Sequence, residues 1–215
     1  FVGNNKIVLE IGSGPGSITR LLREHGNCQV SAIERDPAAI EKVTPFCKHV
    51  YQCDLNDPAW PLVTSSEGLF QVVVAADVLE HLYDPLATLR AMKGILAEDG
   101  YVVVSLPHVG HNAIVACLVD EDFDYQDYGL LDKTHIRFFG IKNIQRLFDD
   151  AGFKLVEAEF VVKSPEQTEF ASRWRAASKD LKESLKCNPY GLVYQVVVKA
   201  SPDSAGRGGL ALYGL

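Results

Sequence analysis

The chain has 215 residues, of which 47% are hydrophobic and 23% are charged, with 21 lysines and arginines against 28 aspartates and glutamates. That length suits one α/β domain with a full hydrophobic core. The net charge of −7 argues against a protein whose main affinity is for nucleic-acid phosphates. The chain also lacks the run of about 20 apolar residues that a membrane-spanning helix needs. Its five cysteines contain no C-x-x-C pair, so we expect free thiols and a cytoplasmic location.

In the first half of the chain, short apolar runs alternate with helical patterns. The run at 70–76, FQVVVAA, is the most hydrophobic and is predicted to be a central strand. Alternation of this kind is typical of a parallel sheet with helices on both faces. We expect strands at 6–11, 29–34, 49–53, 70–76 and 101–106, and helices at 17–25, 37–43 and 85–96.

After Pro107 the alternation is interrupted. Residues 108–140 form a predicted insertion that contains a short apolar helix at 113–119 and an acidic, aromatic stretch at 120–128. The pattern then resumes, and we expect a helix at 141–151, a strand at 153–162, one amphipathic helix at 166–185 and a last strand at 192–199. The helix at 166–185 aligns an apolar stripe that is typical of a core or a dimer interface, namely Phe170, Trp174, Ala177, Leu181 and Leu185.

These patterns together predict an α/β fold. We expect one domain over residues 1–200, built on a doubly wound, mostly parallel sheet of seven strands. An insertion at 108–140 follows the fifth strand, and an extra helix precedes the last strand. Residues 201–215 have the composition of a tail.

A glycine-rich turn follows the first predicted strand. Gly12, Gly14 and Gly16 let the backbone turn tightly and approach a ligand closely. Glu34 ends the second strand, where an acid in a nucleotide-binding sheet accepts hydrogen bonds from the two ribose hydroxyls. The spacing G-x-G-x-G departs from the G-x-G-x-x-G of dinucleotide sites. Glu10, just ahead of the turn, suits a ligand that carries positive charge, such as an ammonium or a sulfonium.

The turn resembles motif I of the class I S-adenosylmethionine-dependent methyltransferases, E/D-x-G-x-G-x-G, which matches VLEIGSGPGS at 8–17. In the same order as in that family, AIERD at 32–36, CDL at 53–55 and VAADVLEHL at 74–82 resemble the segments after the second, third and fourth strands. The segment EDGYVVV at 98–104 resembles the start of the fifth strand. The resemblance implies a Rossmann-like methyltransferase fold, S-adenosylmethionine as cofactor and S-adenosylhomocysteine as product.

The resemblance also assigns cofactor-binding roles. It implies that Glu34 binds the ribose hydroxyls, that Asp54 and the next backbone amide meet the adenine, and that the segment 77–82 lies beside the methionine part. The residues expected to bind the cofactor are Glu10, Gly12, Ser13, Gly14, Gly16, Glu34, Arg35, Asp54, Leu55, Asp77, Val78 and His81.

Two features depart from the common family pattern. Family members usually carry helices before motif I, whereas five residues precede Lys6 here, so either those helices were cut off or the site is more open than usual. The insertion contains GLLDKTHIRFFG at 129–140, which resembles the L-D-x-T-H-x-R-F-F segment of a bacterial branch. Members of that branch often sit among sugar-modifying and polysaccharide enzymes.

Methyl transfer from a sulfonium requires no metal or covalent intermediate, but the acceptor atom must be held about 3–3.5 Å from the methyl carbon. For a hydroxyl acceptor, a base that removes the proton adds about 10²–10⁴-fold to the rate. His135 and His111 are the candidate bases, since an ordinary histidine accepts a proton near neutral pH. The alternative for His135 is a loop histidine that holds the insertion through a backbone hydrogen bond.

The candidate substrate contacts are Arg137, His108 and Tyr128. Arg137 could clamp a phosphate or carboxylate; its alternative is an ion pair with the acids between 120 and 127. We assign no metal ligands, because those acids lack the spacing of a known metal-binding loop.

The sequence favours an S-adenosylmethionine-dependent methyltransferase that O-methylates a small molecule or a glycan or lipid-linked intermediate. The alternative is a non-catalytic S-adenosylmethionine-binding module of a larger assembly. A nicotinamide-dependent oxidoreductase is disfavoured by the glycine spacing and by Glu10. We expect no nucleic-acid partner and no membrane insertion, and a homodimer is left open.

Overall fold

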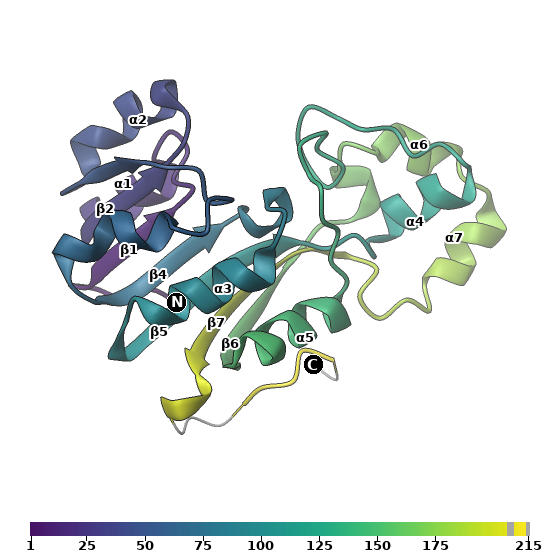
Figure 1. Cartoon of the computed structure of the whole chain (residues 1–215). Helices are drawn as coiled ribbons and strands as arrows, with labels where there is room; N and C mark the ends of the chain where they lie inside the picture. The colour runs from purple at the N-terminus through teal and green to yellow at the C-terminus, as the bar shows by residue number, and fades with distance from the viewer. Residues whose placement is uncertain (206–208, 214–215) are drawn as a thin grey trace.

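The computed structural model describes residues 1–205 and 209–213. A seven-stranded sheet, with strand order β3-β2-β1-β4-β5-β7-β6, runs through the molecule (Figure 1). The strands are β1 (Ile7–Ile11), β2 (Gln29–Glu34), β3 (Val50–Gln52), β4 (Phe70–Ala76), β5 (Leu96–Pro107), β6 (Phe153–Val162) and β7 (Val193–Pro202). The helices are α1 (Ser17–Glu24), α2 (Pro37–Val43), α3 (Pro85–Gly94), α4 (Asn112–Val119), α5 (Ile141–Ala151), α6 (Ala171–Ala176) and α7 (Lys179–Leu185). Short 3₁₀ turns are η1 (Thr44–Phe46), η2 (Trp60–Glu67), η3 (Leu79–His81), η4 (Pro165–Gln167) and η5 (Asp203–Ala205).

The sheet confirms the predicted doubly wound, mostly parallel architecture. Strands β1 to β5 pair in parallel, while β7 lies between β5 and β6 and is antiparallel to both. The strand order reverses between β1 and β4, which are direct neighbours. The connections that leave these two strands diverge to opposite sides, and ligands bind doubly wound sheets at such a point.

The central strands are buried on both faces, which explains their continuous apolar runs. Side chains alternate between the faces along a strand. Leu9 and Val73 therefore join one hydrophobic cluster, and Val8 and Val72 join the cluster on the opposite face. The carboxyl ends of the strands are thus fixed to a rigid core.

Two helices that follow strand ends begin at the predicted residues. Pro37 and Pro85 occupy the first turns of α2 and α3, where a missing N–H costs no helical hydrogen bond. Asp36 caps α2 by accepting from Ala38 N, and Asp84 caps α3 by accepting from Ala87 N.

Strand β5 is longer than predicted. It begins at Leu96, which pairs with Phe70, and the next paired residue, Tyr101, lies opposite Val72. The residues just before the predicted start at Tyr101 therefore belong to the strand, which is irregular there.

The prediction of a single helix at 166–185 is wrong. The segment divides into η4, α6 and α7, because Ala177 is extended, with ψ at 145°, and Ser178 starts a new helix by accepting from Leu181 N. Phe170 and Trp174, the first half of the predicted stripe, are buried within this chain. Together with α4, these helices form a lobe at one end of the sheet (Figure 1).

The segment predicted as a tail is in part structured. Strand β7 continues to Pro202, and residues 206–208 and 214–215 of that prediction lie outside the described residues. Leu210 N donates to Leu155 O, 2.7 Å away, and Leu212 N donates to Gln145 Oε1, 2.9 Å away. The side chain of Leu212 is fully buried.

All five cysteines are free. Among the helices within residues 1–205 and 209–213, none is long and apolar enough to cross a membrane.

The burial of Leu212 predicts that its segment stabilises the domain. Leu212→Ala should lower the free energy of unfolding by about 2–5 kcal/mol, because a buried leucine leaves a cavity. Urea denaturation measures this loss. Tyr213→Ala, at a side chain that is 51% exposed, is the matched control and should change stability by less than about 0.5 kcal/mol. Equal effects of the two variants would contradict the docking of this segment.

Candidate active site

An open cleft lies at the carboxyl ends of β1, β2, β3 and β4, at the point where the strand order reverses. It collects residues that are far apart in the sequence, and most of those predicted to bind a cofactor are among them. The lining residues are Gly12, Ile33, Glu34, Arg35, Cys53, Asp54, Leu55, Asn56, Asp77, Val78, His81 and Leu82.

Glycine is required at two positions of the turn after β1. Gly12 has φ at +65°, and a Cβ on it would lie 2.7 Å from Val78 Cγ2. Gly16 has φ at +90°, begins α1 and would place a Cβ 2.8 Å from Val43 Cγ2. Both positions combine a left-handed backbone with a close neighbour, so any side chain would displace the turn.

Glu34 fastens this turn to the end of β2. Its carboxylate accepts from Gly14 N at 2.7 Å, from Arg35 N at 2.7 Å and from Asp36 N at 2.9 Å. A carboxylate offers about four acceptor sites. One site therefore remains for a ligand hydroxyl, and a second hydroxyl would compete with a backbone donor.

Asp54 and Asn56 shape the wall of the cleft after β3. Asp54 accepts from Asn56 N at 2.9 Å, and this bond is the main reason that the pKa of Asp54 is lowered. Arg35 Nη1 lies 3.4 Å from Asp54 Oδ2. The sequence analysis did not single out Asn56, whose Oδ1 accepts from Tyr83 N at 2.9 Å and so connects two loops of the cleft.

Asp77, at the end of β4, is held in a strained conformation. Its φ is +54°, a region that costs a non-glycine residue about 1–3 kcal/mol. Its Oδ1 accepts from Ser105 Oγ at 3.0 Å and from Gln195 Nε2 on β7. These bonds from β5 and β7 fix the side chain at the mouth of the cleft.

Glu10 does not line the cleft. It is buried, and its carboxyl accepts a hydrogen bond from Thr19 Oγ1 on α1. Burial raises the pKa of Glu10 to about 7, against a smaller lowering by Thr19. The expected contact between Glu10 and a positively charged ligand is therefore not direct in this geometry. In the turn after β1, Ser13 Oγ is buried and has no hydrogen-bond partner among the described residues.

Three side chains converge beside the cleft: Glu80, His81 and His135, hereafter the Glu80–His81–His135 group. One ligand atom from each lies within 4.8 Å of the others. The His81 and His135 ring centroids are 4.8 Å apart, and His135 Nε2 lies 3.8 Å from Glu80 Oε1. Burial lowers the pKa of His135 and raises the pKa of Glu80 to about 8.

The insertion is attached to the sheet through this group. The backbone oxygen of Glu80 accepts from Ile136 N at 2.9 Å and from Arg137 N at 3.0 Å. His81 Nδ1 lies 3.1 Å from Thr134 O, and His135 Nδ1 lies 3.3 Å from Leu130 O. Glu80 lies within the VAADVLEHL segment at 74–82 but is not among the predicted site residues; its position next to His81 is the signal in the sequence.

The other two predicted histidines are buried away from the cleft. His111 Nε2 lies 2.9 Å from Lys163 O, and its Nδ1 accepts from Ala113 N at the start of α4. His108 Nδ1 lies 3.1 Å from Val193 O. Burial lowers the pKa of both, and the two ring nitrogens of His111 are engaged.

Arg137 and Tyr128 lie on the insertion. Arg137 donates to Tyr83 O at 2.6 Å and to Ile136 O at 3.1 Å. In the 120–127 stretch, Asp122 and Asp124 pair with Arg173, and Asp127 pairs with Lys133. Within residues 1–205 no acid of this stretch pairs with Arg137, so the alternative of an ion pair there is wrong. Tyr128 is 68% exposed.

The raised pKa of Glu10 predicts a pH-dependent stability. A folded-state pKa of about 7, above the ordinary 4.5, means that the protonated form stabilises the fold. This contribution is complete below about pH 4.5 and is lost as the pH rises through about 7. Between pH 5 and pH 8 we expect the wild type to lose about 2 kcal/mol relative to Glu10→Gln, measured by urea denaturation.

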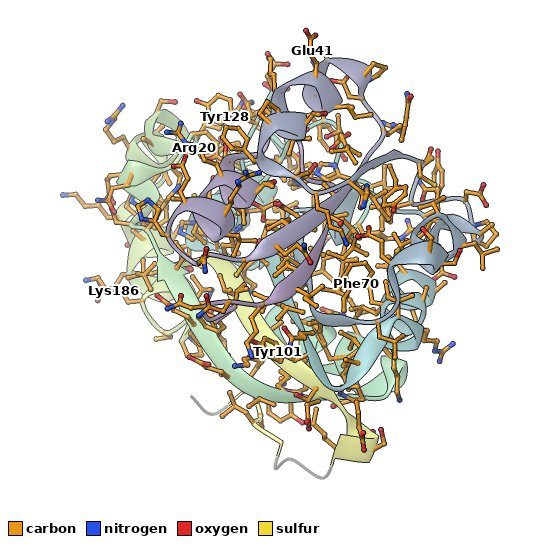
Figure 2. The ribbon with its side chains drawn as sticks, turned by 90° about the vertical axis from the view of Figure 1, so that its left-hand side faces the viewer. Arg20, Glu41, Phe70, Tyr101, Tyr128 and Lys186 are labelled. Carbon is orange, nitrogen blue, oxygen red and sulfur yellow. The ribbon has the colours of Figure 1, made fainter. Side chains whose placement is uncertain are left out.

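The control for that comparison is Glu41→Gln, at an exposed acid that projects from α2 (Figure 2). Its stability should follow the wild-type pH dependence. A parallel pH profile of the wild type and Glu10→Gln would show that Glu10 is not the titrating group.

Comparison with known proteins identifies the family of the chain. Residues 3–158 match the methyltransferase domain family. The ubiquinone biosynthesis O-methyltransferases of Psychrobacter arcticus and Psychrobacter cryohalolentis are each 27% identical over 158 residues, which cover 69% of this chain but 59% of theirs. The chain thus spans less than two thirds of the length of these curated relatives.

Solved structures share the fold. An S-adenosylmethionine-dependent methyltransferase from Archaeoglobus fulgidus has a TM-score of 0.59 at 15% identity, over 93% of this chain and 87% of its own. Another from Mesorhizobium loti has a TM-score of 0.57 at 14% identity, over 93% and 92%. The match to the methyltransferase domain family covers most of the chain. The chain therefore belongs to the class I S-adenosylmethionine-dependent methyltransferases.

Proposed function

We propose that this chain transfers the methyl group of S-adenosylmethionine to a hydroxyl of a small molecule or of a glycan or lipid-linked intermediate. The observation that carries the proposal is the cleft at the strand-order reversal, with the Glu80–His81–His135 group beside it. One end of the cleft offers groups for a nucleoside, and the other offers groups for acid–base chemistry.

The cofactor would extend across the ends of the first four strands. We assign Glu34 to the ribose hydroxyls, the Asp54–Leu55 segment to the adenine, and Asp77, Val78 and His81 to the methionine part, all of which line the cleft. The turn at Gly12–Gly16 would approach the ligand with its backbone. Glu10, which does not line the cleft, would support the site indirectly by holding α1 through Thr19.

The acceptor would enter from the insertion. Arg137 and Tyr128, on the exposed side of that segment, are the proposed acceptor contacts. His111 and His108 are buried with their backbone partners and fit a structural role better than a catalytic one.

Transfer breaks the C–S bond, forms a C–O bond and releases one proton from the acceptor hydroxyl. In this proposal that proton is lost at the Glu80–His81–His135 group, since His81 lines the cleft and His135 lies against it. The O-methyltransferase names of the Psychrobacter relatives support oxygen as the acceptor atom.

The proposal predicts that His135 is needed for turnover and not for cofactor binding. His135→Ala should reduce turnover at least about 100-fold, with the dissociation constant for S-adenosylmethionine within about twofold of the wild type. Release of S-adenosylhomocysteine, measured with phenols, catechols and sugar nucleotides as acceptors, gives the rate. His25→Ala, at an exposed histidine after α1, is the control and should be unchanged.

Unchanged turnover in His135→Ala would remove His135 from the mechanism. Cofactor binding without transfer to any hydroxyl in the panel would favour the non-catalytic binding module.

A further inference from the structure

We propose that Glu80, His81 and His135 hold one divalent transition-metal ion, and that this ion binds the acceptor hydroxyl. The metal site stands on the geometry of the three side chains. Only its catalytic use rests on the proposed methyl transfer.

The first observation is the burial of Glu80 without a hydrogen-bond partner for its carboxylate. Its side chain is 1% exposed, and neither carboxylate oxygen has a hydrogen-bond partner among the described residues. A buried carboxylate without a donor or a cation is costly, so native structures satisfy such groups. The nearby ring of His135 does not satisfy it, because its Nε2 is 3.8 Å from Oε1, beyond hydrogen-bond distance.

The second observation is how the two imidazoles are held. His81 Nδ1 lies 3.1 Å from Thr134 O, and His135 Nδ1 lies 3.3 Å from Leu130 O. A backbone carbonyl only accepts, and the Thr134 hydroxyl, 3.1 Å from His81 Nδ1, donates its proton to Asp132 Oδ1. Each Nδ1 therefore carries the proton, and each Nε2 keeps its lone pair. Histidine ligands of metal ions are oriented in this manner by a backbone carbonyl or a carboxylate.

The three ligand atoms are close enough for one ion after a small adjustment. They lie within 4.8 Å of one another. Zinc-type ions bind histidine nitrogen and carboxylate oxygen at about 2.0–2.2 Å, so the side chains would move together by about 1 Å. Glu80 and His81 are adjacent on η3, and His135 is fixed against them by the bonds from Glu80 O to Ile136 N and Arg137 N.

The donor set selects the class of ion. Two imidazoles and one carboxylate suit Zn²⁺, Fe²⁺ or Mn²⁺, whereas Mg²⁺ and Ca²⁺ prefer oxygen ligands throughout. Three protein ligands leave positions for an exogenous oxygen. His81 lines the cleft, so those positions are reached from the cleft.

The ion would act on the acceptor as a Lewis acid. Binding of the hydroxyl oxygen would lower the pKa of that hydroxyl, so that its proton is lost to solvent beside the Glu80–His81–His135 group and no histidine of the group has to accept it. The oxygen lone pair then forms the bond to the methyl carbon, and the electron pair of the breaking C–S bond stays on sulfur. The products are the methyl ether, S-adenosylhomocysteine and one proton, so atoms and charge balance.

The test uses the untagged full chain, stripped with EDTA and titrated with Co²⁺ and Zn²⁺ by calorimetry and by the visible absorption of bound Co²⁺. We expect one ion per chain with a dissociation constant below about 10 μM. His135→Gln and Glu80→Gln should each weaken binding at least about 100-fold. His49→Gln, at an exposed histidine outside the group, is the matched control and should bind as the wild type does.

A variant could bind metal weakly only because it is poorly folded. Measuring the Tm of each stripped protein with and without Zn²⁺ detects this case. Zn²⁺ should raise the Tm of the stripped wild type and of His49→Gln, and should leave the Tm of Glu80→Gln unchanged. Stripped Glu80→Gln should melt no lower than the stripped wild type, because the substitution replaces a buried carboxyl that has no hydrogen-bond partner among the described residues with an amide of the same size that carries no charge at any pH. No saturation by about 1 mM metal, or equal affinity in the wild type and both variants, would overturn the site.

Binding of S-adenosylmethionine by the stripped protein separates this inference from the proposed function. Metal binding without cofactor binding would leave the metal site in place and refute the methyl transfer. Cofactor binding and turnover by the stripped protein, with no gain on adding metal, would refute the catalytic use of the ion.

Discussion

The close approach of β1 and β4 is the constraint on which the rest of the site depends. The two strands are neighbours in the sheet, and the turn after β1 lies so near the segment after β4 that a Cβ on Gly12 would be 2.7 Å from Val78. Because Gly12 has no side chain, the turn can lie against the D-V-L-E-H-L segment, and the two form one edge of the cleft. Glu34 then holds the turn from the other side through Gly14 N.

That edge also joins the half of the cleft proposed to bind the cofactor to the half proposed to receive the acceptor. Asp77 lines the cleft and is bonded to β5 and β7, while Glu80, three residues later, accepts from the backbone of the insertion at Ile136 and Arg137. One short segment after β4 thus positions both halves.

Much of this arrangement was predictable from the sequence, because its signals are local. The glycine spacing, the acid that ends β2 and the prolines that open α2 and α3 each act within a few residues. The failures arise from contacts between distant residues. Gln195 bonds Asp77 from 118 positions away, and Phe170, within the segment predicted as one helix, packs against residues of α4. Nor does the sequence show that Glu10 meets Thr19 instead of a ligand.

The central claim is that the cleft binds S-adenosylmethionine through its turn and through Glu34. The most direct test is a calorimetric titration of the wild type and Gly12→Ala with S-adenosylmethionine, S-adenosylhomocysteine and NAD in parallel. We predict micromolar binding of the two adenosyl ligands, weaker binding of NAD, and loss of all three in Gly12→Ala because Val78 blocks the added methyl. Tighter binding of NAD than of either adenosyl ligand, or unchanged affinity in Gly12→Ala, would contradict the account.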